Sequence, residues 1–596
     1  MRRVVIIDSA IDYTHVSLKN SNIIQYEMNR NGGWEIVRDV DCKTGHGTAI
    51  ANILSSTIND AVEIINFIVF DQNLKTTELI IISALKYIYD NIRCSIINMS
   101  LGMPFYNNEI HNLCKLFYEK NIIIVAAFDN WGGITYPAAF EEVIGVDASY
   151  KCINKRDFVY VENSVVNLKA KGGNQRVAWH NPQYVISSGS SMAAPYVTAE
   201  IINHCNSLTP DSIKRHFCEI SKHQYCFNAN SFATNKRNFF PITNAALFPC
   251  NKEVHSLLNF KECISFQIAG VYDFKYSGQI GIRYSTVTGE EFLIENIDLC
   301  NWNSIDTLIL GHVLLDNRAY SDNISKLMDL CLENGINVFC FDMKIYQQYK
   351  ECFEERGLQI FSPGLIGSSN LFNKFGKLYR VERPIIGIFG TSSKQGKFTL
   401  QLQLRQVFVK KGYTVGQLGT EPQSLLFNMD ECLPFGYNAP FELNERDMIE
   451  AVNYVIHEID LKQPDIILAG CQSGTVPFDY NNAYKITVKQ LFFLAGLNPD
   501  LAIICVNCYD SINYIRRTIQ VVEGYGRCKV VSLAMSPLKI DSRWGQFTDK
   551  KIMMNREELD SAIYRLQDEF HLPVIKIGDK GDIDTLYKIC IDLLGE

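Results

Sequence analysis

Short apolar runs recur along the whole chain, and each of them leads into polar residues. Examples are residues 4–7, 122–127, 384–389 and 502–506. An unbroken apolar run of this length is typical of a strand that is buried on both faces of a parallel sheet. Helical patterns separate such runs, as expected for βαβ units. The sequence therefore predicts an α/β protein built on doubly wound parallel sheets.

Three polar positions near such runs supply a carboxylate, an imidazole and a hydroxyl. Asp8 ends the first run, His46 lies between two glycines before the helical pattern of residues 49–54, and Ser191 lies in the small-residue stretch 188–195. A carboxylate can hold an imidazole in one tautomer, and the imidazole can take the proton of an attacking hydroxyl. The order Asp, His, Ser distinguishes one class of serine hydrolase from two others with the same geometry. We predict acyl transfer on a peptide.

Two segments between His46 and Ser191 complete this predicted site. A predicted strand ends in Ser100, Leu101 and Gly102, which we expect to form an exposed edge that pairs with an extended peptide substrate. The strand 122–127 leads to Asn130, whose amide can donate to a developing oxyanion. Such a donor contributes roughly 2.7–4 kcal/mol to transition-state stabilisation.

Residues 1–235 resemble the subtilisin-like serine proteases (subtilases), because all these segments occur in the same order and context. The resemblance implies a serine endopeptidase in which proteolysis requires no cofactor. It also implies a role for each residue of the site. Asp8 is the orienting acid and His46 the general base and acid, while Ser191 is the nucleophile and Asn130 the oxyanion donor.

The chain departs from the subtilase pattern at three positions near these residues. Ala10 and Asp129 stand where the family usually has glycine, and Ser190 replaces the usual threonine. Aspartate tolerates unusual backbone angles better than most residues. Its charge beside a developing anion slows catalysis unless the side chain points away. Because the triad is intact, we expect an active protease in preference to an inactive pseudoprotease.

Features of the whole chain predict a cytoplasmic protein. Met1 lies seven residues before Asp8, which leaves no room for a signal peptide or pro-segment, and no run of 18 apolar residues predicts a membrane span. The 19 cysteines lack regular spacing, which favours reduced thiols, and no metal-ligand spacing stands out. A net charge of −8 over 596 residues indicates no nucleic-acid partner.

A polar stretch over residues 221–237 predicts a boundary, followed by a domain over residues 240–380. Within that domain, a strand at 307–311, a helix at 325–334 and a strand at 337–342 indicate a Rossmann-like βαβ unit. The domain lacks the Gly-x-Gly-x-x-Gly fingerprint, so we assign it no dinucleotide. We interpret it as a scaffold or peptide-recognition domain.

A second chemical signal follows the apolar strand that ends before Gly390. A loop from Gly390 through Gly396 and Lys397 leads into a helix, which is the context that a phosphate-binding loop requires. Backbone N–H groups and the helix dipole hold phosphate, and Lys397 adds charge at the terminal phosphates. The spacing is one residue longer than usual. Phe398 stands where a magnesium-binding Ser or Thr normally lies, so Thr399 is the candidate replacement for this ligand. The predicted ligand of the loop is ATP or another nucleotide with Mg²⁺.

Residues 383–596 resemble the dethiobiotin synthetase-like P-loop group, in which residues 464–474 match the second phosphate-side strand. Ala469 stands where those relatives tend to have glutamate, which argues against metal-dependent transfer more than against nucleotide binding. Asn507 and Asp510 follow a further predicted strand, where they are candidates for contacting a nucleobase. A vestigial loop is the alternative.

The combination predicts an intracellular serine endopeptidase that cleaves a precursor (leader) peptide, with a P-loop region that binds nucleotide and recognises substrate or regulates cleavage. The whole architecture resembles fused proteins of clostridial-type peptide natural-product maturation systems, which implies leader removal by analogy. Two alternatives stay open. One is an ATP-dependent ligase or transferase with an accessory protease domain, and the other is a non-catalytic scaffold that binds the precursor.

Overall fold

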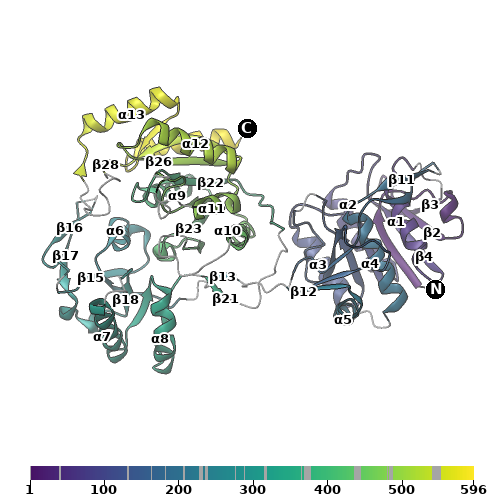
Figure 1. Cartoon of the computed structure of the whole chain (residues 1–596), viewed down its shortest axis with the longest axis horizontal. Coiled ribbons are helices and arrows are strands. Elements are labelled where there is room, and N and C mark those ends of the chain that lie inside the picture. The colour runs from purple at the N-terminus through teal and green to yellow at the C-terminus, as the bar shows by residue number, and fades with distance from the viewer. Residues whose placement is uncertain are drawn as a thin grey trace. The chain divides into compact units, whose positions relative to one another are not determined.

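The computed structural model forms two compact units. Unit 1 comprises Met1–Ser231 with Ser369–Arg380, and unit 2 comprises Phe232–Ser368 with Val381–Glu596 (Figure 1). The structure describes residues 2–595 except for the following positions: 39, 41, 131–132, 163, 182, 206–208, 227–231, 235–238, 276, 287–288, 314–317, 364, 368–376, 435–444, 479–480, 482–487 and 540–551.

Unit 1 is built on one ten-stranded sheet with the order β12-β8-β9-β7-β6-β5-β1-β4-β2-β3. All neighbours are parallel except the β8–β9 and β2–β3 pairs. The strands are β1 (Arg2–Asp8), β2 (Asn22–Met28), β3 (Trp34–Val37), β4 (Val62–Ile68), β5 (Ile96–Met99), β6 (Ile123–Ala127), β7 (Val143–Ser149), β8 (Val159–Glu162), β9 (Leu168–Lys171) and β12 (His223–Cys226). A separate hairpin joins β10 (Gln175–Ala178) to β11 (Tyr184–Ser187).

Helices cover both faces of this sheet (Figure 1). One face packs on α1 (His46–Ser55), α4 (Ser190–His204) and α5 (Pro210–Ile220), and the other on α2 (Glu78–Asn91) and α3 (Asn108–Glu119). In β1, Val4 and Ile6 belong to the first core, whereas Val5 and Ile7 belong to the second. All four side chains are therefore buried, which explains why the run has no polar alternation.

The register of three neighbouring strands brings their carboxyl ends to one edge of the sheet. Ile7 pairs with Met99, and Met99 pairs in turn with Ala126. The residues that follow β1, β5 and β6 therefore lie side by side, as is usual for sites at the ends of parallel strands. The predicted α/β class with parallel sheets is confirmed.

Unit 2 contains two seven-stranded sheets. The first has the order β16-β17-β15-β14-β18-β19-β20 and is parallel except at β16–β17. Its strands are β14 (Asn244–Phe248), β15 (Gln267–Asp273), β16 (Arg283–Ser285), β17 (Glu291–Asn296), β18 (Thr307–Leu310), β19 (Asn337–Cys340) and β20 (Ile360–Phe361). Its helices are α6 (Lys252–Asn259), α7 (Arg318–Asn334) and α8 (Met343–Glu355). The predicted βαβ unit is β18, α7 and β19.

The second sheet is parallel throughout, with the order β24-β23-β25-β22-β26-β27-β30. Its strands are β22 (Ile385–Gly390), β23 (Val415–Gly419), β24 (Glu431–Cys432), β25 (Ile466–Gly470), β26 (Leu501–Val506), β27 (Lys529–Met535) and β30 (Val574–Lys576). Its helices are α9 (Lys397–Lys410), α10 (Glu445–Asp460), α11 (Lys489–Leu497), α12 (Ile512–Gly526), α13 (Arg556–Phe570) and α14 (Lys580–Leu594). Two further pairs are β13 (Phe232–Thr234) with β21 (Leu365–Gly367), and β28 (Leu538–Lys539) with β29 (Ile552–Met553).

The two sheets of unit 2 share a hydrophobic core. Leu402 of α9 and Phe427 pack in one cluster with Phe240 and Leu247 from the region of the first sheet. The sequence analysis predicts a separate domain for each of these sheets, over residues 240–380 and 383–596. The shared core explains why they form one compact unit.

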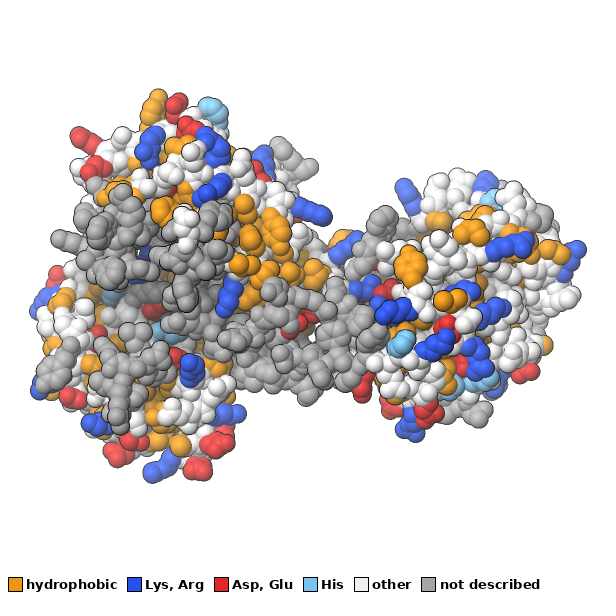
Figure 2. All heavy atoms as spheres, viewed as in Figure 1, with side chains coloured by type: hydrophobic (Ala, Val, Ile, Leu, Met, Phe, Trp, Pro, Cys, Tyr) orange, Lys and Arg blue, Asp and Glu red, His pale blue; other side chains and the backbone are white. Residues whose placement is uncertain are grey.

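The surface carries charges of both signs. The visible face of unit 1 shows Lys and Arg side chains interspersed with Asp and Glu (Figure 2). Among the described residues, no helix is long and apolar enough to cross a membrane. The described cysteines form no disulfide.

Candidate active site

Asp8 and His46 are in direct contact at the carboxyl end of β1. The Nδ1 atom of His46 lies 2.8 Å and 3.0 Å from the two Asp8 carboxylate oxygens. The Asp8 carboxylate is buried and also accepts a hydrogen bond from the Ser9 backbone N–H. A carboxylate at Nδ1 keeps the proton on that atom and leaves Nε2 as the acceptor.

The same contact sets the pKa of His46. Burial lowers the pKa of the imidazole, but the negative charge of Asp8 and its hydrogen bond raise it. The net effect raises the pKa of His46 above its ordinary value. The pair is therefore arranged to stabilise an imidazolium when the ring takes up a proton.

The glycines on either side of His46 allow two close approaches. A Cβ atom on Gly47 would lie 2.3 Å from the Ser9 carbonyl oxygen, and one on Gly45 would lie 2.0 Å from the Trp179 ring. Gly47 also donates its N–H to the Ser9 hydroxyl. A larger residue at Gly47 would displace α1 from the end of β1, so this glycine brings the imidazole close to Asp8, and Gly45 leaves room for the Trp179 ring.

Ser191 lies in the first turn of α4 and is tied to the end of β5. The Ser100 hydroxyl donates to the Ser191 carbonyl oxygen at 2.9 Å, and Asn98 donates to the Ser100 hydroxyl at 3.0 Å. Helix α4 packs in the same core as α1, which carries His46. The structure thus holds Ser191 at the strand that neighbours β1, the strand of Asp8.

Asn130 is held beside Ser191 through the intervening serine. Its side-chain oxygen accepts from the Ser190 N–H at 2.9 Å and lies 3.0 Å from the Ser190 hydroxyl oxygen. Because these contacts occupy the oxygen, the NH₂ group is the part of the amide that remains to donate. Gly189 has a φ of 131°, and a Cβ there would lie 2.7 Å from the Asn130 oxygen. This position therefore favours glycine.

The Asp129 carboxylate is engaged by groups outside the predicted triad. One oxygen accepts from the Gly133 N–H at 3.0 Å, and the other lies 3.4 Å from the Arg380 guanidinium. The Asp129 N–H donates to the Thr135 hydroxyl at 3.1 Å. One neutral and one cationic donor thus hold the Asp129 carboxylate. No motif in the sequence around Asp129 predicts its contact with Arg380.

The predicted peptide-pairing edge is only partly exposed. Ser100 and Leu101 are buried, and the Ser100 hydroxyl is used by Ser191, whereas Gly102 is exposed. Beyond Gly102 the chain turns inward, because Met103 exchanges backbone hydrogen bonds with Tyr136. The expectation of an exposed edge over all three residues is therefore corrected to Gly102, although pairing with substrate through the backbone of this segment stays a prediction.

The phosphate-loop candidate joins β22 to α9 in unit 2. Gly396 is the N-cap of α9, with a φ of 89° and no side-chain cap, so the N–H groups of the first turn could donate to an acceptor from outside the helix. Lys397 is largely buried, and its ammonium donates to the Ser392 carbonyl oxygen at 2.6 Å. A Cβ on Gly390 would lie 3.0 Å from the Gln395 side-chain oxygen. The uncapped start of α9 and the lysine beside it are suited to binding an anion.

Asp510 lies behind this loop. Its carboxylate accepts from the Thr391 hydroxyl, from the Gln395 amide at 3.4 Å and from the Asn507 N–H at 2.7 Å. Burial raises the pKa of Asp510, and these hydrogen bonds act in the opposite direction. Asp510 and Asn507 are thus part of a network that supports the loop, and their contact with a nucleobase stays a prediction.

Packing explains the unusual residue after Lys397. The Phe398 ring lies 5.3 Å from the Phe427 ring, edge to face, and packs against the core that the two sheets share. A hydroxyl residue would lose this apolar contact. Thr399 is half-buried beside it, and Ala469 is fully buried in the sheet.

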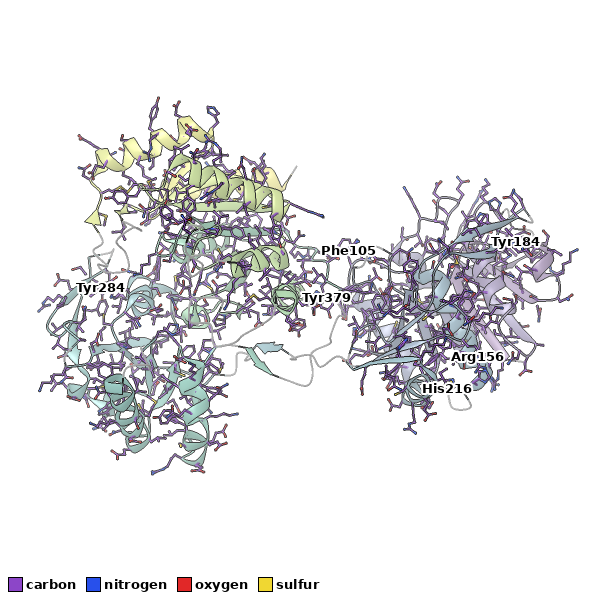
Figure 3. The ribbon with its side chains drawn as sticks, in the orientation of Figure 1. Phe105, Arg156, Tyr184, His216, Tyr284 and Tyr379 are labelled. Atoms are coloured by element: carbon purple, nitrogen blue, oxygen red, sulfur yellow. The ribbon has the colours of Figure 1, made fainter. Side chains whose placement is uncertain are left out.

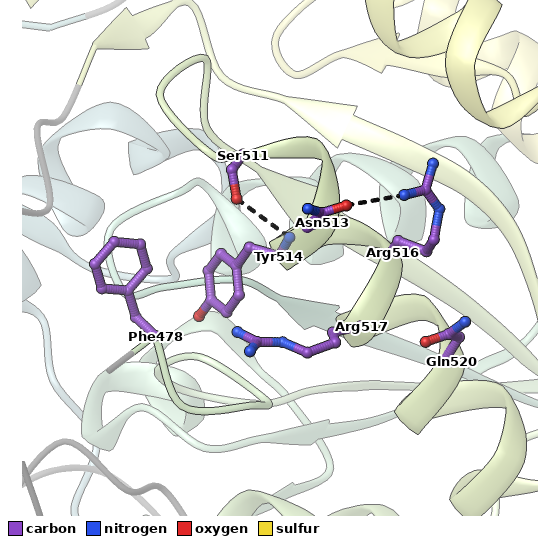
Figure 4. Close-up of a pocket in the computed structure, with 7 residues that line it drawn as sticks. All are labelled: Phe478, Ser511, Asn513, Tyr514, Arg516, Arg517 and Gln520. Atoms are coloured by element: carbon purple, nitrogen blue, oxygen red, sulfur yellow. Dashed lines mark hydrogen bonds between the residues drawn. The ribbon is translucent and has the colours of Figure 1, made fainter. Parts of the chain in front are cut away.

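An open pocket of about 490 Å³ lies next to the loop, and the sequence patterns did not reveal it. Its lining comes largely from the start of α12 and comprises Phe478, Ser511, Asn513, Tyr514, Arg516, Arg517 and Gln520 (Figure 4). The Tyr514 hydroxyl reaches the loop by a hydrogen bond to the Thr391 carbonyl oxygen. In the sequence, Tyr514 has the spacing of an ordinary core residue of a helix, so no motif marks this pocket.

Comparisons with known families agree with both predicted resemblances. The model of the subtilase family matches residues 3–231. A model described as the P-loop domain of a domain of unknown function (DUF1611_C) matches residues 374–587. The chain thus carries a subtilase domain followed by a P-loop domain.

Several curated serine proteases match about a third of the chain. The thermophilic serine proteinase of Bacillus sp. (strain AK1) is 28% identical over 207 residues, which are 33% of this chain and 50% of that protein. The major intracellular serine protease of Bacillus subtilis (strain 168) is 26% identical over 219 residues, 33% and 66% of the two chains. Subtilisin DY of Bacillus licheniformis is 26% identical over 212 residues, 33% and 73%. The chain spans about half the length of the thermophilic proteinase.

Two solved structures are also similar. A cold-adapted subtilisin-like serine proteinase matches with a TM-score of 0.31 and 21% identity, over 36% of this chain and 79% of that one. The prenylagaramide maturation protease PagA matches with a TM-score of 0.28 and 18% identity, over 37% and 82%.

The Asp8–His46 contact predicts how the pKa of His46 responds to a substitution at Asp8. Asp8→Asn removes the charge that raises the pKa of His46 but leaves the burial that lowers it. We expect the His46 pKa to lie above about 6.5 in the wild type and to fall below that value in Asp8→Asn. NMR titration of the imidazole resonances measures both values. An unchanged pKa in the variant would contradict the assigned contact, and Asp12→Asn serves as the control.

Proposed function

We propose that the subtilase domain of unit 1 is a serine endopeptidase whose nucleophile is Ser191. The observation that supports this most directly is the buried Asp8 carboxylate on Nδ1 of His46, at the strand next to the one that anchors Ser191. This arrangement leaves Nε2 of the imidazole to accept a proton. Proteolysis on this proposal needs only groups of the chain itself.

The proposed reaction begins when the Ser191 hydroxyl attacks the peptide carbonyl and His46 takes its proton at Nε2. Asp8 stabilises the resulting imidazolium, and the NH₂ group of Asn130 donates to the oxyanion. His46 then protonates the leaving amine. Water repeats the same sequence on the acyl-enzyme and releases the second product.

We propose a peptide or precursor peptide as the substrate. An extended segment would pair with the backbone near Gly102 while its scissile carbonyl approaches Asn130. The side chain of the attacked residue then lies between Gly102 and Asp129. Thr135 closes this gap, because its hydroxyl accepts from the Asp129 N–H and lies 2.6 Å from where a Cβ on Gly102 would be. We therefore expect a small residue at this substrate position.

For the P-loop domain, we propose nucleotide binding that accompanies or regulates cleavage. The uncapped first turn of α9 and the buried Lys397 would hold the phosphates. A bound Mg²⁺ would neutralise phosphate charge, with Thr399 as the nearest hydroxyl to the usual ligand position. Because Ala469 is buried and apolar, the strand end lacks the carboxylate that a metal-dependent transferase would use, which favours a protease over the ligase alternative. A cytoplasmic location is part of this proposal.

Replacement of the nucleophile tests the protease proposal. We expect Ser191→Ala to lower peptide hydrolysis by at least about 10⁴-fold, since the other groups cannot supply an attacking oxygen. Mass spectrometry of a peptide library after incubation measures the products. Ser55→Ala in α1 is the matched control and should cleave like the wild type. Equal cleavage by Ser191→Ala would refute the assignment.

The Thr135 side chain tests the substrate proposal. Thr135→Gly should raise kcat/KM about tenfold or more for peptides with Leu or Phe before the cleaved bond, relative to those with Ala. Thr135→Ser retains the hydroxyl and should keep the preference for Ala. Rates on matched peptide series give these ratios. An unchanged Leu-to-Ala ratio in Thr135→Gly would show that this side chain does not limit the substrate.

Lys397 tests the nucleotide proposal. We expect Lys397→Met to weaken ATP binding at least about tenfold, because the variant loses the cation at the phosphates. Titration calorimetry with ATP and Mg²⁺ measures the affinity. Lys394→Met alters an exposed lysine of the same loop and should have the smaller effect. Equal affinities of wild type and Lys397→Met would exclude this loop as the phosphate site.

A further inference from the structure

A short segment from late in the sequence belongs to unit 1. Residues 377–380, here called the docking segment, run beside the loop that follows β6. Leu378 forms a parallel bridge with Gly133, and its carbonyl oxygen accepts from the Ile134 N–H at 3.0 Å. Only four residues separate the docking segment from β22, the strand that leads into the phosphate-loop candidate.

Buried and charged contacts hold the docking segment in place. Lys377 is 6% exposed, and its ammonium lies 3.5 Å from an Asp147 oxygen and 5.1 Å from the centre of the Phe128 ring. Tyr379 packs against the core formed with α2 and α3, and Figure 3 labels it. A buried lysine with an anion and an aromatic ring is a specific contact, so the segment is an integral part of unit 1.

The docking segment touches the two residues that immediately precede Asn130. Lys377 lies over Phe128, whose carbonyl oxygen accepts from the Ser190 hydroxyl. Arg380 pairs with Asp129 at 3.4 Å. Since Ser190 also binds the Asn130 amide oxygen, the segment supports the backbone that carries the oxyanion donor.

The negative charge of Asp129 is the group on which Arg380 acts. A carboxylate one residue from Asn130 opposes the negative charge that develops during acyl transfer. The Arg380 guanidinium offsets that charge and, together with the Gly133 N–H, fixes the carboxylate in one position. The Arg380 side chain is 47% exposed, so the pair adds little to folding stability. We therefore expect the Arg380–Asp129 pair to affect the stability of the transition state more than that of the fold.

We propose that Arg380 is a positioning residue of the oxyanion site, and that the protease site is complete only when the docking segment is bound. This inference rests on the proposed function of unit 1. Arg380 acts through Asp129, which it neutralises and holds. The stretch that precedes β22 thereby contributes to a site whose other members all lie before residue 192.

A double-mutant cycle in the full-length chain tests this role. Arg380→Met should lower kcat about tenfold, because Asp129 keeps its charge and loses the cation that offsets it. KM and the melting temperature should change little. Asp129→Asn removes that charge but retains an oxygen for the Gly133 N–H. In this background, Arg380→Met should lower kcat less than about twofold. An equal loss of kcat in both backgrounds, or no loss in either, would overturn the proposal.

A matched control is Arg156→Met. Arg156 is also an exposed arginine of unit 1 in an ion pair, with Glu200, and it lies near His216 (Figure 3). This variant should keep the kcat of the wild type. A loss of kcat equal to that of Arg380→Met would show that any exposed ion pair of the unit has the same effect, which contradicts a specific role.

Hydrogen exchange gives a readout that does not depend on catalysis. Arg380→Met should increase amide exchange in peptides that cover Asp129 and Ile134, whereas Arg156→Met should not. If the wild type cleaves no peptide yet exchange responds in this way, the proposed function fails and the docking of Arg380 on Asp129 stands. If exchange is unchanged by Arg380→Met, the inference fails whatever the activity.

Discussion

The hydrogen bond between the Asp8 carboxylate and Nδ1 of His46 joins the end of β1 to the beginning of α1. It requires a buried strand that stops at a polar residue and a helix that approaches without a side chain at Gly47. The parallel register of β1 with β5 then brings the Ser100–Ser191 contact to the same edge. Chemistry at this edge follows from the way the sheet is built, since carboxyl ends of parallel strands converge.

The second unit uses the same principle with a different result. Its β22 ends at Gly390, and the helix that follows presents N–H groups where the first unit presents side chains. An imidazole and a hydroxyl suit covalent attack, whereas a glycine loop with Lys397 suits the binding of an anion. The shared core around Phe427 couples this loop to the first sheet of the unit.

Local motifs were sufficient to predict the fold class, the two family resemblances and the strands that carry the site. Runs such as residues 4–7 are continuous in sequence, so burial on both faces leaves a visible pattern. The packing of Phe398 and the supporting position of Asp510 were not predicted. Both depend on neighbours that are distant in the chain, Phe427 in one case and the Thr391 loop in the other.

The contact between Arg380 and Asp129 shows this limit most clearly. The sequence indicated that Asp129 was unusual and that its orientation mattered, but its partner lies 251 positions away. A single surface arginine carries no periodic signal, and its neighbours in sequence belong to the approach to another sheet. Only the three-dimensional structure connects the two.

The most direct test of the central claim is covalent labelling of the nucleophile. We predict that a fluorophosphonate will react with the full-length chain and that peptide mass spectrometry will locate the adduct on Ser191. Asp8→Asn should slow the labelling strongly, because His46 then loses the carboxylate that orients it. No adduct on Ser191, or equal labelling of another serine, would contradict the assignment.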